Sequence, residues 1–111
     1  MTTPFIKESD QQVMARLRKP IDELIEKYCS DKTDYQKLRL RQLAWQAVDV
    51  LIRTRSISNL QNQKDIKRIC LDIHELGASE VFIEESLALA VAIYRRMQIY
   101  HPLLLKTYGS R

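Results

Sequence analysis

Few residues in this chain have the types and spacing that chemistry requires. Cys70 and His74 are four residues apart, so in a helix both side chains could reach one metal ion. A complete site needs three or four ligands, and Cys29 and His101 are distant in the sequence. A cysteine and histidine could also act as nucleophile and base, but that reaction needs an oxyanion site that the sequence does not reveal. We therefore expect no metal ion, no cofactor and no catalytic residue.

Carboxylates gather in residues 72–86, which carry five Asp or Glu and no Lys or Arg. Glu80 and Glu84 are one helical turn apart and could hold a metal ion or form a catalytic pair. A di-metal helical bundle also needs Glu-x-x-His motifs on two other helices, and the sequence has none. Acids at the start of a helix and Arg95–Arg96 near its end instead complement the helix dipole. We expect the acids to have that role and the protein not to be an enzyme.

The composition favours helices. The chain has 111 residues, 45% of them hydrophobic, with two glycines and three prolines, which argues against a β-rich, turn-rich fold. Apolar spacings of three and four predict an all-α fold, a compact bundle of four main helices with the second and fourth central. We expect one domain, with helices at about 10–28 (kinked at Pro20), 34–55, 61–76 and 79–100, and terminal extensions 1–8 and 101–111.

Local signals mark the ends of these helices. Ser9 with Gln12, and Thr33 with Gln36, have the spacing of a capping box. Gly77 is placed to end the third helix in a left-handed conformation.

Pro20 leaves two arrangements open for the first helix, one kinked helix or two nearly collinear segments. The apolar stripe continues in helical phase from Leu17 through Ile21, which favours the single helix. On the second helix, Arg41 falls within the apolar arc, so its charged group must extend to solvent or find a partner.

The strongest indication of function is that the sequence has more apolar helical surface than one compact chain is expected to bury. Residues 86–94 carry no charge in a chain that is 29% charged. On a helical wheel, helix 79–100 has a broad apolar face and also a narrower second strip. We expect that strip and the C-terminal tail to bind a second copy or a protein partner through Val81, Ala88, Ala92, Ile99, Leu104 and Tyr108, rimmed by Glu84, Glu85, Arg95 and Arg96. The alternative is that the tail and Phe5 and Ile6 cover this surface within one chain.

A basic segment supports a second function. Residues 36–71 carry eight Lys or Arg and two Asp. The candidate phosphate contacts are Arg39, Arg53, Lys64, Lys67 and Arg68. Pairing with Asp49 and Asp72, each one turn away from an arginine, would instead neutralise part of this charge.

Together these patterns predict a non-enzymatic interaction module, a small regulator or adaptor that forms a homodimer and binds a protein partner. The alternative is a regulator that binds nucleic acid through residues 36–71. We find no export signal and no apolar segment long enough for a bilayer, so we expect a cytoplasmic protein with reduced cysteines and no membrane contact.

Overall fold

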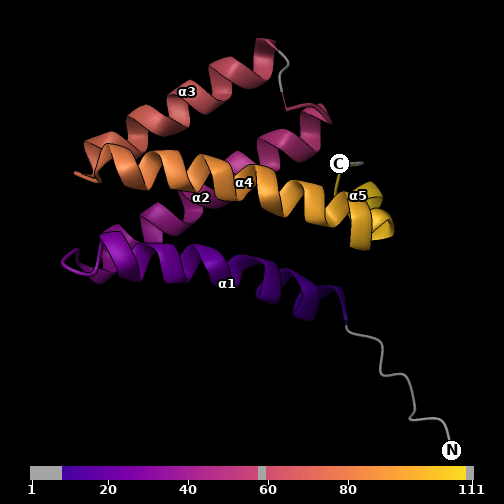
Figure 1. Cartoon of the computed structure of the whole chain (residues 1–111), viewed down its shortest axis with the longest axis horizontal. Coiled ribbons are helices and arrows are strands. Elements are labelled where there is room, and N and C mark those ends of the chain that lie inside the picture. Colours follow the sequence, from indigo (N-terminus) through magenta and orange to yellow (C-terminus); the bar gives the residue numbers. More distant parts are fainter. Residues whose placement is uncertain (1–8, 58–59, 110–111) are drawn as a thin grey trace, which may run out of the picture.

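All regular structure in the described part of the chain is helical (Figure 1). The computed structural model describes residues 9–57 and 60–109, apart from the side chains of residues 60, 61, 108 and 109. The helices are α1 (Asp10–Tyr28), α2 (Asp34–Thr54), α3 (Leu60–Glu75), α4 (Glu80–Tyr100) and α5 (Pro102–Gly109). The predicted all-α bundle is confirmed, and each of the four main helices agrees with its predicted range to within one residue at either end.

Side-chain caps explain where α1 and α2 begin. The backbone N–H groups of Ser9 and Thr33 donate to Oε1 of Gln12 and Gln36 at 2.9 and 3.0 Å. In return, each hydroxyl oxygen accepts from the backbone N–H of that glutamine at 3.2 Å. Both predicted capping boxes are therefore present, and each satisfies donors that a helix N-terminus leaves without partners.

The turn between α3 and α4 is set by two residues. Gly77 has a φ of +81°, and its N–H donates to the His74 carbonyl at 2.9 Å, which ends α3 as predicted. Ser79 then caps α4, because its hydroxyl accepts from the Phe82 N–H at 3.2 Å. Only Ala78 thus separates the left-handed stop of α3 from the N-cap residue of α4.

Pro20 lies inside a continuous α1 rather than between two segments. The buried residues of the helix keep one stripe through it: Val13, Leu17, Ile21 and Ile25. Burial of this stripe against the rest of the bundle offsets the hydrogen bond that proline removes from the helix.

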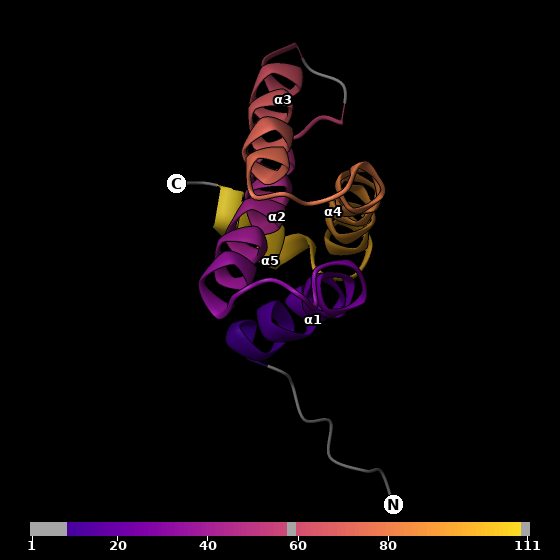
Figure 2. The same cartoon turned by 90° about the vertical axis from the view of Figure 1, so that its left-hand side faces the viewer.

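Helices α2 and α4 occupy the centre, as predicted. Each packs against all four other helices, with α1 along one side of the pair and α3 along the other (Figures 1 and 2). The core draws most heavily on α2, whose buried residues are Leu40, Leu43, Ala44, Trp45, Ala47, Val48, Val50, Leu51 and Ile52. Burial of these nine residues explains why α2 is apolar on most of its circumference.

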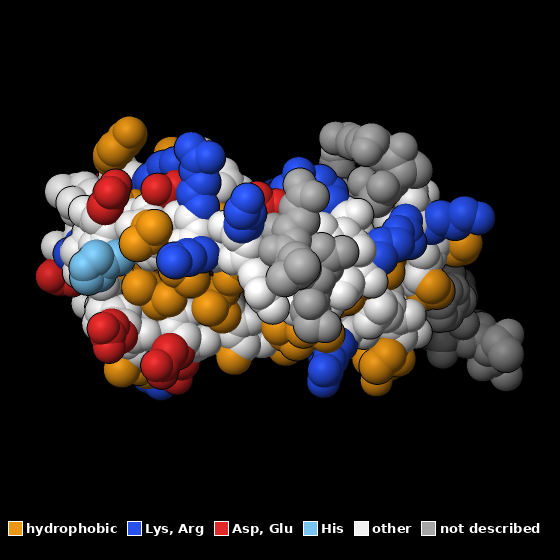
Figure 3. Space-filling model, turned by 90° about the horizontal axis from the view of Figure 1, so that it is seen from above, with side chains coloured by type: hydrophobic (Ala, Val, Ile, Leu, Met, Phe, Trp, Pro, Cys, Tyr) orange, Lys and Arg blue, Asp and Glu red, His pale blue; other side chains and the backbone are white. Residues whose placement is uncertain are grey.

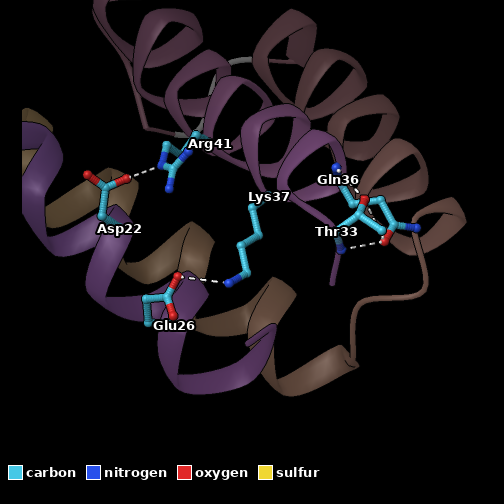
Figure 4. Close-up of polar contacts among 6 residues, drawn as sticks. All are labelled: Asp22, Glu26, Thr33, Gln36, Lys37 and Arg41. Atoms are coloured by element: carbon cyan, nitrogen blue, oxygen red, sulfur yellow. Dashed lines mark hydrogen bonds and ion pairs between the residues drawn. The ribbon is translucent and has the colours of Figure 1, made fainter. Parts of the chain in front are cut away.

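Two ion pairs join α1 to α2 (Figure 4). Arg41, which the sequence places in the apolar arc of α2, donates through Nε to Oδ1 of Asp22. One turn earlier on α2, Lys37 Nζ lies 3.1 Å from Oε1 of Glu26. Because the Arg41–Asp22 pair is about half-exposed and the Glu26 carboxylate is largely exposed, each pair contributes roughly 0–1 kcal/mol and mainly orients the two helices.

The predicted C-terminal extension contains the fifth helix. α5 packs on α2 and α4, and Leu105 is only 7% exposed within the core. Leu104 is half-buried against the same core. The predicted extension 1–8, with Phe5 and Ile6, lies outside the described residues. Among the helices of the described chain, none has both the length and the apolar content needed to cross a bilayer.

Candidate protein-interaction surface

The second strip predicted on helix four is exposed in the folded chain. Val81 and Ile99 are 50% and 69% exposed, and Ala88 and Ala92 between them are also exposed. On the helical wheel these four residues lie opposite the buried side of α4, which consists of Phe82, Ser86, Ala90, Ile93, Tyr94 and Met97. We call Val81, Ala88, Ala92 and Ile99 the outer strip of α4. Leu104 and Leu105 of α5 pack on the core, and the four residues of the outer strip remain exposed.

A groove runs beside the outer strip, between α1 and α4. It consists of two adjoining cavities of about 530 and 480 Å³, which share Pro20, Leu89 and Ala92. Its α1 wall includes residues that the sequence reasoning missed, namely Arg16, Leu17, Pro20, Glu23, Leu24 and Lys27. Their spacing of three and four along one helix was a usable signal, but only the packing of α1 on α4 placed this face beside the strip.

Charge is divided between the ends of this α1–α4 groove. One cavity is lined by Arg16, Arg95 and Arg96, with no acidic residue among its described lining residues. The other is lined by Glu23 and Glu85, together with Lys27. The groove therefore has a basic end, a more acidic end and an apolar centre around Pro20 and the two alanines.

The structure brings six of the ten predicted interface residues to this groove: Ala88, Ala92, Ile99, Glu85, Arg95 and Arg96. Val81 and Glu84 are exposed on the same helix but do not line the groove. Leu104 lies on α5, packed against the core. The side chain of Tyr108 lies outside the described residues.

Glu85 has an unusual environment in the wall of the groove. Its Oε2 atom is buried and accepts no hydrogen bond within the described chain, although the residue as a whole is partly exposed. A buried oxygen without a donor is costly, and the cost is larger when the group is charged. A cationic side chain from outside the chain would lower that cost.

The basic residues predicted to contact nucleic acid are only partly brought together. Arg53 and Arg68 line one cavity of about 340 Å³ between α2 and α3, but Asp49 and Asp65 line it as well. Arg39 lies outside that lining, with its Nη1 3.5 Å from Oε1 of Gln42. Lys64 and Lys67 are exposed on α3.

The face that carries α3 shows the same division of charge (Figure 3). Most acidic side chains gather toward the end where α3 passes into α4, and the basic side chains are spread along the rest. The carboxylates in the Arg53–Arg68 cavity weaken its attraction for phosphate, because they repel the same ligand.

Burial lowers the reactivity of the two cysteine thiols. Burial is the main cause that raises the pKa of Cys29 and of Cys70. Near Cys29, Lys32 acts in the opposite direction but is the smaller influence. A raised pKa reduces the thiolate fraction, which is the nucleophilic and metal-binding form. No group of three or more His, Cys, Asp or Glu in the described chain is arranged to hold a metal ion.

Comparison of the chain with protein families, with curated proteins and with solved structures finds no match in any of the three.

Proposed function

We propose that this chain is a non-enzymatic interaction module, a small cytoplasmic regulator or adaptor that binds a protein partner through α4. The observation that carries the proposal is the outer strip, where Ala88, Ala92 and Ile99 remain exposed on the side of α4 opposite its buried residues. An exposed apolar strip with charged residues at its edges is typical of a protein interface, with a dry centre and a polar rim.

The side chains suit a helix as the bound element. Ala88 and Ala92 have no atoms beyond Cβ, so a partner backbone can approach α4 closely at its centre. Val81 and Ile99 provide larger apolar groups at the two ends, and complete burial of each contributes up to about 1.5–3 kcal/mol. The charged rim adds orientation and association rate more than affinity.

The test compares two alanine-to-arginine variants for capture of partners from an extract of the native cells. Ala92 lies on the outer strip and in the groove, whereas Ala15 is exposed on α1 and outside the groove lining. Both Ala92→Arg and Ala15→Arg add the same charge and bulk to an exposed helical position. We expect immobilised wild type and Ala15→Arg to retain the same protein, and Ala92→Arg to lose it. Equal retention by all three chains would show that this surface is not the binding surface.

A further inference from the structure

We infer that the outer strip of α4 binds a second copy of this chain, with the two α4 helices antiparallel across a two-fold axis level with Ala90. The inference rests on the proposed function and deepens it by naming the partner. A two-fold dimer requires one surface that is complementary to itself, so that each contact occurs twice. The order of residues along α4 meets that condition.

The apolar residues of the strip are placed symmetrically about Ala90. Ala88 and Ala92 are two residues from it on either side, and Val81 and Ile99 are nine residues from it. Antiparallel packing therefore sets Ala88 opposite Ala92 of the second copy. It also sets Val81 opposite Ile99 of the second copy. The two alanine pairs at the centre allow the helices to approach closely, and the larger side chains close the ends.

The flanking charges decide the orientation. On the helical wheel, Glu84 and Arg95 lie along one edge of the strip, and Glu85 and Arg96 lie along the other. A two-fold axis perpendicular to α4 keeps each edge on its own side and reverses its direction. Glu84 then meets Arg95 of the second copy, and Glu85 meets Arg96 of the second copy. Parallel packing in register would set each of these four charges against its own kind.

Helix α1 extends the same charge pattern. It runs antiparallel to α4 (Figure 1), with Pro20 level with Leu89 and Ala92. Arg16 therefore adds to the basic end of the groove, and Glu23 adds to the acidic end. An antiparallel second copy places its basic end beside the acidic end of the first. Lys27 is the exception, a positive charge at the more acidic end.

Glu85 provides an independent reason to expect a cation at this position. One of its carboxylate oxygens is buried without a hydrogen bond from the described chain. In the antiparallel arrangement, the guanidinium of Arg96 of the second copy approaches this carboxylate, and a small rotation of the carboxylate would let it accept a charge-assisted hydrogen bond.

The first measurement is light scattering over a concentration series. We expect wild type and Ala15→Arg to form dimers, and Ala92→Arg to dissociate at least tenfold more readily because it sets two arginines into the centre of the interface. A wild-type chain that stays monomeric at the highest concentration overturns the inference. If Ala92→Arg still loses its partner from the extract, the proposed function stands without the homodimer.

Charge reversal tests the pairing. Glu84→Arg alone and Arg95→Glu alone each place like charges opposite one another twice per dimer, so each should weaken self-association at least tenfold. A mixture of the two variants restores opposite charges at both positions and should associate more tightly than either variant alone. A mixture no tighter than the separate variants contradicts the assigned register.

Cysteine cross-linking tests the orientation. Positions 81 and 99 lie about 27 Å apart along one α4, at 1.5 Å per residue. Val81→Cys and Ile99→Cys should therefore form a disulfide-linked dimer when mixed under oxidising conditions and should not do so separately. The native chain, which carries Cys29 and Cys70, provides the background. Efficient cross-linking of Val81→Cys with itself would indicate parallel helices and overturn the inference.

Discussion

Lys32 Nζ lies 2.8 Å from the position that a Cβ atom on Gly77 would occupy. Lys32 belongs to the turn between α1 and α2, and Gly77 to the turn between α3 and α4, so the two turns meet at one end of the bundle (Figure 1). The ammonium group is close to the C-terminal end of α3, where a positive charge is favourable. This contact joins two halves of the chain that are far apart in the sequence.

Gly77→Ala should lower the free energy of unfolding by about 1–2 kcal/mol, because an L side chain is strained at a φ of +81°. Chemical denaturation measures this value. The lysine ammonium is the flexible end of its side chain and can move aside, so the strain comes from the backbone. We therefore expect nearly the same loss when Gly77→Ala is made in a Lys32→Ala background. A loss that disappears in that background would show that the Lys32 contact was its cause.

Leu40→Ala should lower the free energy of unfolding by about 2–5 kcal/mol, since it leaves a cavity in the core, where the side chain of Leu40 is fully buried. Leu38→Ala, two residues away on the same helix, is the matched control because Leu38 is 49% exposed and Leu40 is 0% exposed. We expect the control to change stability by less than about 1 kcal/mol. Urea unfolding at low protein concentration separates this effect from association. Similar losses for both variants would contradict the packing of α2.

The thiols of Cys29 and Cys70 should react slowly with an aromatic disulfide reagent at neutral pH, because burial raises the pKa of each above its ordinary 9.0. Reaction in urea should be much faster. The pKa of each thiol is higher in the folded chain than in the unfolded chain. The thiols therefore stabilise the folded chain below pH 9, and this contribution is lost as the pH rises through the folded-state pKa. A Cys70→Ala chain reports on Cys29 alone. Rapid native-state labelling of that chain would contradict its burial.

Binding to random DNA or RNA should be undetectable at physiological salt. Arg53 and Arg68 share their cavity with Asp49 and Asp65, so little net positive charge faces a phosphate there. A fluorescence titration of labelled oligonucleotide over a range of salt concentrations measures this. Asp65→Asn, which removes one of these carboxylates, should strengthen whatever weak low-salt binding exists. Tight wild-type binding with a steep salt dependence would restore the nucleic-acid hypothesis.

The helices were predictable because their signals are local. A capping box such as Thr33 with Gln36 acts over three residues, and the left-handed stop at Gly77 needs one residue without a Cβ. The exposure of the outer strip on α4 was predictable for a similar reason. Helical periodicity alone places Ala88 and Ala92 opposite the buried Ala90.

The amino-acid sequence by itself determined where each main helix begins and ends, which side of it is buried, and the order of residues along α4 that is symmetric about Ala90. Only the tertiary structure decided that α1 forms the second wall of the groove, that Arg53 of α2 and Asp65 of α3 line one cavity, and that Lys32 reaches Gly77. The reason is the distance along the chain over which each kind of interaction acts. Periodicity and capping act within a few residues, whereas the angle and register between helices depend on how all the buried side chains pack together.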